Sequence, residues 1–444
     1  MMRLLPILLL CLLPNAFAAG PPGKVFPFPY TQEDLPNGLR LVTVPTGFPD
    51  IVSLYIVVRA GSRNEVEPGK SGFAHLFEHL MFRGTPRYPA EKYNSLLREA
   101  GADFNAFTNT DSTVYHSTFS KQDLDTMLML EADRFQNLKY SVDVFKTETL
   151  AVLGEYNKNA ADPSEKLEEA LLDAAFTRHT YKHPTMGILK DVEDMPNQYD
   201  YGLEFFSRYY RPEYVTVIVA GDVNRARVRP AVDRYFGKWK RGNYRQEAPA
   251  EPRQEDPRTA RVAWPSPTLP WLAVAFHAPA YSDSDPEWAS LNLLAQLGFS
   301  KNSDLYQKLV IQEQRVDLLD ASLVQSPDPF LFTIEARIKS ADDMPYVREQ
   351  VFQTLENFVS KPVEKEELDL VRQHLRYRFT LSLNNTEAVA SAVARSLRAG
   401  RSVDTINRLY DLYARITPQD IQRAAGKYLA STNRTTVTLT GGSR

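Results

Sequence analysis

The chain has 444 residues, about three times the length of a typical single domain, so we expect two or more domains. Hydrophobic residues make up 43% of it and charged residues 24%, which excludes a disordered, collagen-like or coiled-coil chain. Fifty-two Lys and Arg against 55 Asp and Glu leave a net charge of -3 without a basic block, so binding to nucleic acid or to a membrane surface is not expected.

The first residues have the features of a cleaved secretory signal. Arg3 precedes an almost wholly apolar run from Leu4 to Leu13, and Ala16-Phe17-Ala18 supplies an A-x-A cleavage site, which predicts a signal peptide over residues 1–18. A membrane anchor is the alternative, but this run is far shorter than the roughly 20 residues that a spanning helix needs. Cys11 is the only cysteine and lies inside the signal. We therefore predict an exported protein, periplasmic or alternatively secreted, that has no cysteine nucleophile and no Cys-rich metal site.

The first half alternates strand and helix patterns. Segments rich in β-branched residues predict strands at 39–45, 51–59 and 214–220, and an extended segment at 104–119. Helices are predicted at 72–82, 91–99, 121–138 and 143–160. This order predicts an α+β fold in which helices cover a mostly antiparallel sheet.

The second half repeats this outline after a proline-rich stretch. Prolines at 249, 252, 257, 265, 267 and 270 predict a linker over 241–270, between an N-terminal domain at 19–240 and a C-terminal domain at 271–444. RYYRPEYVTVIVAG at 208–221 and KYLASTNRTTVTLTG at 427–441 share a Tyr-led helix end, a turn and a β-branched strand. We expect two homologous domains.

The segment GFAHLFEHL at 72–80 contains the pattern H-x-x-E-H. At about 100° per residue, His75, Glu78 and His79 share one helical face, so two imidazoles can bind one metal beside a carboxylate. Two neutral imidazoles and one carboxylate suit zinc, with a fourth position left for water. The alternative is a helix in which these three side chains only hydrogen-bond locally.

This segment resembles the inverzincin signature, and the chain is similar to the pitrilysin/insulinase family of metallopeptidases, in the short two-domain branch that includes the mitochondrial processing peptidases and bacterial periplasmic relatives. Glu155 lies 76 positions after His79, and Glu148 lies seven before Glu155, as the family pattern requires. The resemblance implies a half-clamshell of two domains with one zinc ion per chain, held by His75, His79 and Glu155 with Glu148 as their support. Without the upstream motif, Glu148 and Glu155 would be two solvated acids on a helix surface.

The stretch Asn105-Ala106-Phe107-Thr108 is also similar to the family. In relatives it forms an edge strand beside the metal, and the substrate adds to it as an extra strand. The resemblance therefore implies that Asn105, Ala106 and Phe107 bind substrate, whereas Asn105 taken alone is compatible with an ordinary turn.

One feature of active relatives is missing. They have, in the second domain, an Arg followed seven residues later by a Tyr, which help to bind and polarise the substrate carbonyl. Here Val310 and Asp317 occupy the matching positions, and this degenerate domain has no H-x-x-E-H, since its matching helix contains Leu291 to Leu297 instead. Relatives solve this by pairing a metal-bearing subunit with a paralogue that has Arg-x6-Tyr and no H-x-x-E-H. The resemblance therefore implies a heterodimer.

These features together predict an exported zinc metalloendopeptidase that hydrolyses peptides or unfolded segments, with Glu78 as the general base. The alternative is a zinc-binding structural or assembly subunit without peptidase turnover, which an intact Glu78 argues against. The other histidines, at 116, 179, 183, 277 and 374, are scattered, and we predict structural roles for them.

Overall fold

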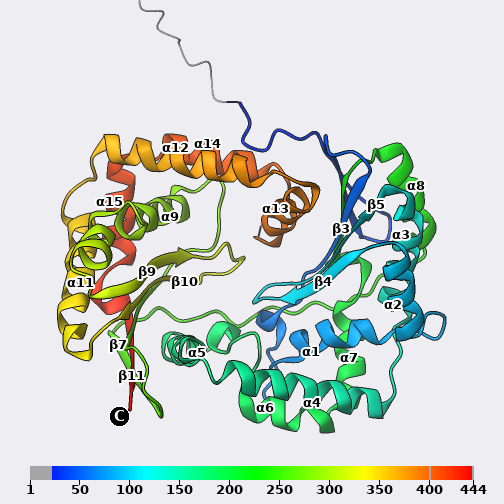
Figure 1. Ribbon diagram of the computed structural model, residues 1–444, viewed down its shortest axis with the longest axis horizontal. Helices are drawn as coiled ribbons and strands as arrows, with labels where there is room; N and C mark the ends of the chain where they lie inside the picture. The colour runs from blue at the N-terminus through cyan, green and yellow to red at the C-terminus, as the bar shows by residue number, and fades with distance from the viewer. Residues whose placement is uncertain (1–22, 400–401, 443–444) are drawn as a thin grey trace, which may run out of the picture.

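Two β-sheets organise the protein in a computed structural model that describes residues 23–399 and 402–442 (Figure 1). The predicted signal peptide lies outside the described residues. The first sheet has the strand order β1-β2-β6-β3-β5-β4. Its strands are β1 (Thr31–Asp34), β2 (Arg40–Pro45), β3 (Ile51–Val58), β4 (Asp103–Thr108), β5 (Thr113–Ser120) and β6 (Val215–Gly221).

The second sheet repeats the topology of the first from β2 onward. Its order is β7-β11-β8-β10-β9, and β7 pairs with β11 in parallel, as β2 pairs with β6, while the other pairs are antiparallel. The strands are β7 (Arg258–Trp264), β8 (Trp271–His277), β9 (Val316–Leu323), β10 (Leu331–Ile338) and β11 (Arg434–Gly441). The prediction of an α+β fold with two related, mostly antiparallel sheets is confirmed.

The predicted linker over 241–270 is wrong in part, because β7 lies inside it. Three prolines precede the strand and three follow it, so the whole stretch is rich in proline although the run RTARVAW within it has none. Alternate residues of this run are half-buried and exposed, as in a strand with one covered face. β7 is also an edge strand, the kind of strand near which proline is best tolerated. The second sheet therefore begins at Arg258 rather than at Trp271.

Helices cover both sheets. The first half contains α1 (Phe73–Leu80), α2 (Ala90–Glu99), α3 (Leu124–Asn137), α4 (Val142–Asn159), α5 (Pro163–Ala175), α6 (Leu189–Asp194), α7 (Tyr199–Tyr209) and α8 (Arg225–Phe236). The second half contains α9 (Pro286–Phe299), α10 (Asp304–Tyr306), α11 (Met344–Ser360), α12 (Lys365–Ser382), α13 (Thr386–Ala399), α14 (Thr405–Arg415) and α15 (Pro418–Tyr428). Among the described residues, no helix combines the length and apolar character needed to cross a bilayer.

Each half contributes a helix to the sheet of the other half (Figure 1). α13 packs on β3 and β6 of the first sheet, and α5 packs on β7, β8 and β11 of the second. This exchange explains why β3 and β6 are almost continuous runs of apolar residues: the first-half helices bury one face, and α13 buries the other. The two halves are therefore joined by shared hydrophobic cores as well as by the chain between them.

An ionic contact also joins the halves. Asp328, in the connection between β9 and β10, lies 2.5 Å from Arg63 Nη2 and 3.1 Å from His179 Nε2. In the first half, Arg63 lies in a short 3-10 helix (Ser62–Asn64), and His179 caps the start of another (Thr180–Lys182). The Arg63 backbone N–H donates to the Thr110 carbonyl in the turn between β4 and β5. Burial alone would raise the pKa of Asp328, but hydrogen bonds from His179 and Arg63 hold this pKa at about 2.

Asp328→Asn should weaken this contact in a pH-dependent way. The pKa of Asp328 in the folded chain lies below its ordinary value of 3.8. The ionised carboxylate therefore stabilises the fold fully above pH 3.8, and this contribution is lost as the pH falls to about 2. We expect a cost of about 1 kcal/mol at pH 7, which allows for the partial exposure of this side chain. Urea unfolding at pH 7 and at lower pH measures the difference, with Asp256→Asn at an exposed position before β7 as the control. A difference that stays constant down to pH 2 would contradict the assignment.

Candidate metal centre

α1 starts at a sharp backbone turn. Gly72 has a φ of +90°, and a Cβ at this position would lie 2.9 Å from the Met186 carbonyl oxygen, so the position requires glycine. The side chain of Glu65 is buried and accepts hydrogen bonds from the backbone N–H groups of Gly72 (2.8 Å) and Ala74 (2.7 Å). Burial raises the pKa of Glu65 to about 8, although these two donors oppose the shift. The contacts fix the first turn of the helix that contains H-x-x-E-H.

His75, His79 and Glu155 converge between α1 and α4. Each offers one ligand atom, and these atoms lie within 4.8 Å of one another. Glu155 Oε2 is 3.7 Å from His75 Nε2 and 3.3 Å from His79 Nε2. The two imidazole rings lie at 82° to each other, with centroids 4.9 Å apart. The structure therefore brings together the three residues that the sequence singled out as ligands.

The chemistry of this donor set fits a zinc ion. Burial lowers the pKa of His75 to about 3, and the neighbouring His79 contributes a smaller part of this shift. The His75 imidazole is therefore neutral near pH 7. A neutral imidazole has the lone pair that a metal requires. Two imidazoles and one carboxylate match the composition of catalytic zinc sites, which keep one position open for water.

Glu148 lies beside these residues rather than among them. It is buried on α4, and its Oε2 is 3.9 Å from His79 Nδ1. Arg83, just beyond α1, donates from Nε to Oε1 (2.7 Å) and from Nη2 to Oε2 (3.0 Å). A carboxylate on the Nδ1 side of the ring can orient His79 so that Nε2 faces Glu155.

Glu78 connects the helix to the first sheet. Its Oε2 accepts a hydrogen bond of 2.6 Å from the Thr108 hydroxyl at the end of β4. Burial raises the pKa of Glu78, while the contact with Thr108 opposes the shift. Glu78 is half-buried and lies on the same helix face as the two histidines. A proton acceptor is thus held next to the place where a metal and its water would sit.

β4 forms the edge of the first sheet beside α1. Asn105 and Phe107 are exposed and Ala106 is buried, so their side chains alternate across this strand. The Ala106 N–H donates to the side chain of Asn105 (2.9 Å). An edge of this kind offers backbone groups to an incoming extended peptide.

The second half has apolar or paired side chains at the positions that the family resemblance assigns to the Arg-Tyr pair and to a second H-x-x-E-H. Val310 packs against the core of the second half, and Asp317 accepts hydrogen bonds from Arg337 Nε (2.8 Å) and Nη2 (3.0 Å). α9 takes the place of α1 and buries Leu291 and Leu294 in the core. The side chains of Val310 and of these two leucines have no hydrogen-bond donor, and the carboxylate of Asp317 is an acceptor. None of these side chains can therefore donate a hydrogen bond to a substrate carbonyl.

Sequence reasoning missed three residues that hold the site: Glu65, Arg83 and Thr108. Glu65 and Thr108 reach α1 from loop and strand segments outside it, and Arg83 reaches across to α4. Such contacts between separate elements leave no periodic pattern in the sequence. Glu65 had no signal in the sequence. Arg83 had one, because a position four residues after His79 continues the same helical face, and Thr108 had one as the last residue of the family-like stretch that begins at Asn105.

Comparison with known proteins identifies the family. The profile described as Insulinase (Peptidase family M16) matches residues 41–188, and the profile described as Peptidase M16 inactive domain matches residues 199–375. The "Zinc protease PqqE" of Helicobacter pylori is 28% identical, with 91% of each chain covered. The mitochondrial-processing peptidase subunit beta of Blastocladiella emersonii is 22% identical over 94% of this chain and 90% of its own.

Solved structures agree with these matches. A protease from Helicobacter pylori superposes with a TM-score of 0.86 at 26% identity, with 93% of this chain and 99% of that chain covered. The periplasmic protease PqqL from Escherichia coli matches in fold over 92% of this chain and 47% of its own, with a TM-score of 0.76 and 20% identity. The two M16 profiles, the zinc protease relatives and the shared fold show that the chain belongs to the insulinase (M16) family of peptidases.

Proposed function

We propose that the protein is a zinc metalloendopeptidase that hydrolyses peptides or unfolded polypeptide segments. The observation that carries the proposal is the convergence of His75, His79 and Glu155 within 4.8 Å, next to a half-buried Glu78. A purely structural zinc site needs no proton acceptor beside its ligands. The relatives named as zinc proteases support the same activity.

His75, His79 and Glu155 would hold the zinc, and Glu148 would orient His79. When bound, zinc supplies a Lewis acid that lowers the pKa of a water molecule and polarises the scissile carbonyl. Glu78 takes the proton from the attacking water on its carboxylate and passes it to the leaving amine nitrogen. Thr108 holds the Glu78 carboxylate in place during both transfers, through the hydrogen bond to Oε2.

The substrate would lie along β4 as an added strand. Main-chain hydrogen bonds to the edge at Asn105, Ala106 and Phe107 hold peptides of varied sequence, since every peptide has the same backbone. Thr108, at the end of this edge, contacts Glu78. An extended peptide bound there passes close to the proton acceptor.

We further propose that the protein is exported, into the periplasm or the medium, and that it is the metal-bearing subunit of a heterodimer. The export proposal rests on the signal-like residues 1–18. The heterodimer proposal rests on Val310 and Asp317, which stand where active relatives have Arg and Tyr. The zinc-binding domain over 19–240 and the degenerate domain that follows it would then face the partner's two domains.

Metal removal tests the proposed activity. Hydrolysis of an internally quenched peptide by the protein with its partner should fall to background after dialysis against a chelator. Stoichiometric zinc should restore it, because α1 and α4 hold the three ligands together. Magnesium at the same concentration is the control, since imidazole ligands do not favour it. Full activity after verified removal of zinc would contradict the proposal.

A further inference from the structure

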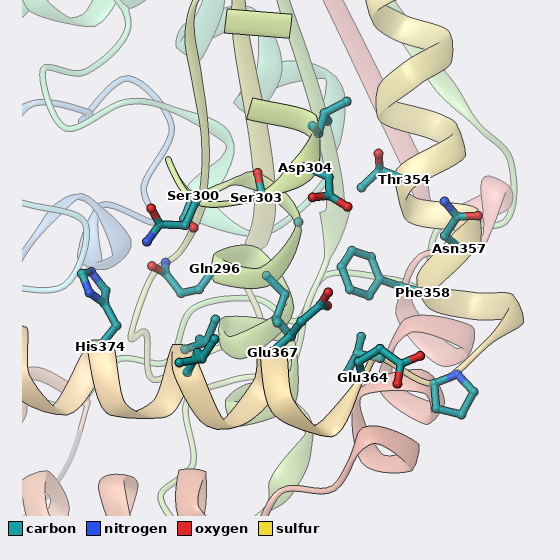
Figure 2. Close-up of a pocket in the computed structure, with 18 of the residues that line it drawn as sticks. Gln296, Ser300, Ser303, Asp304, Thr354, Asn357, Phe358, Glu364, Glu367 and His374 are labelled. Atoms are coloured by element: carbon teal, nitrogen blue, oxygen red, sulfur yellow. The ribbon is translucent and has the colours of Figure 1, made fainter. Parts of the chain in front are cut away.

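A cavity of about 610 Å³ opens in the second half of the fold, between the C-terminal end of α9, α10, α11 and α12 (Figure 2). Its volume is in the range of sites that hold a small ligand or a few side chains of a peptide. No residue of the metal centre lines it. It is therefore a separate feature of the molecule and has no part in the chemistry proposed above.

The cavity has an apolar wall built around Phe358. Leu297, Val363 and Val371 also line it. Phe358 packs on Gly298, where a Cβ would lie 2.8 Å from Cε2 of the ring, so the absence of a side chain at Gly298 makes room for the ring. An aromatic ring fixed in this way offers a face to apolar groups and to cations.

Carboxylates dominate the charge of the cavity. Asp304, Glu364 and Glu367 line it, against a single lysine, Lys361. Within the described part of the chain these three carboxylates have no ion pair, whereas the nearby Asp369 pairs with Lys365 and Arg372.

Two of these carboxylates share one part of the cavity with the aromatic ring. Figure 2 shows the side chains of Asp304, Phe358 and Glu367 gathered there, from α10, α11 and α12 respectively. Unpaired carboxylates beside an aromatic ring are complementary to an ammonium or guanidinium group. The cavity is therefore suited to a basic side chain.

An exposed apolar stripe continues from the cavity along α12. Leu370 lines the cavity and is 66% exposed, and Tyr377 and Leu381, about two and three turns further on, are 66% and 74% exposed. This spacing keeps the three side chains on one helical face. Large apolar side chains grouped in this way mark an interaction surface. The cavity and the stripe together are longer than a single side chain, so an occupant that covers both is a segment of several residues.

We propose that this cavity and the α12 stripe form a second binding site for the polypeptide substrate, which takes a Lys or Arg side chain next to apolar residues. Charge complementarity selects this occupant: the basic group lies against Phe358 near Asp304 and Glu367, and apolar neighbours cover Leu370 and Tyr377. That the bound polypeptide is a substrate rests on the proposed peptidase function. The site would hold long basic substrates by contacts away from the scissile bond.

Fluorescence anisotropy on the zinc-loaded Glu78→Gln chain tests the proposal without turnover. The probe is a fluorescein-labelled 12-residue peptide of alternating Leu and Arg, and a second peptide has citrulline in place of every Arg. Asp304→Asn with Glu367→Gln should weaken binding of the Arg peptide about tenfold and leave the citrulline peptide nearly unchanged, because charged contacts are lost only in the first case. Glu349→Gln with Glu356→Gln, on exposed positions of α11, removes the same charge and should change neither affinity.

Equal affinity of the Arg peptide for the Asp304/Glu367 variant and the control would overturn the proposal. An equal loss for both peptides would also overturn it, because the site would then not recognise charge. If the Asp304/Glu367 variant instead fails to assemble with the paralogous subunit in sedimentation, the cavity is a subunit interface and the proposal is wrong. Thermal melting and zinc content confirm that each variant is folded. Since binding is measured without hydrolysis, a failure of the proposed peptidase activity would leave these results interpretable.

Discussion

Glu78→Gln should lower peptide hydrolysis by about two orders of magnitude or more, while the zinc content and the thermal melting temperature stay unchanged. Gln has the size of Glu and can still accept the hydrogen bond from Thr108, so the local structure should persist. It cannot take up the proton of the attacking water, so the step that depends on a general base is lost.

Initial rates with an internally quenched peptide measure this effect, in the presence of the partner subunit and at equal zinc occupancy of the Glu78→Gln variant and the unchanged chain. Glu99→Gln at the exposed end of α2 is the control and should keep the rate of the unchanged chain. Unchanged turnover in the Glu78 variant would assign the role of base to another group. Loss of zinc together with activity would instead show that Glu78 supports the metal.

The chain on its own should be nearly inactive, even with zinc bound. From the resemblance to the family, we place Val310 and Asp317 at the positions of the donor pair of active relatives, and Asp317 is already paired with Arg337. Loss of one donor to the developing negative charge costs about 10²- to 10³-fold in rate. Addition of a paralogue that has Arg-x6-Tyr should therefore raise hydrolysis by at least that factor.

Titration of the zinc-loaded chain with such a paralogue measures this gain, and replacement of the paralogue's Tyr by Phe should remove it again. The paralogue alone is the control, since without H-x-x-E-H it should not hydrolyse the peptide. High activity of the homogeneous chain without any partner would defeat the heterodimer proposal. Other donors of this chain would then serve the carbonyl.

Much of the fold and the helical face of the candidate metal site could be predicted from the sequence for physical reasons. A helix repeats every 3.6 residues, so the spacing of His75, Glu78 and His79 alone places them on one face. The seven-residue step from Glu148 to Glu155 places both side chains on one face of α4, whereas their assignment to the metal site came from the resemblance to the family. Runs of β-branched residues marked β3 and β6, because these strands are buried on both faces.

Features that depend on contacts between distant segments were not predictable. β7 was not predicted because the prolines on both sides of it dominate the composition of residues 241–270, although the strand itself has no proline. The packing of α5 and α13 on the sheet of the other half was not predictable either. An amphipathic pattern shows that a helix has an apolar face but not which sheet that face covers. Glu65 and Thr108 likewise act on α1 only through the folded arrangement.

The zinc content of the purified mature chain tests the central claim most directly. After reconstitution and removal of free metal, elemental analysis should find about one zinc per chain, because three ligands of zinc-preferring type converge on one point. His75→Ala, His79→Ala and Glu155→Gln should each abolish tight binding, while Glu99→Gln should not change it. A content near zero for the unchanged chain, or full zinc occupancy in the ligand variants, would contradict the account.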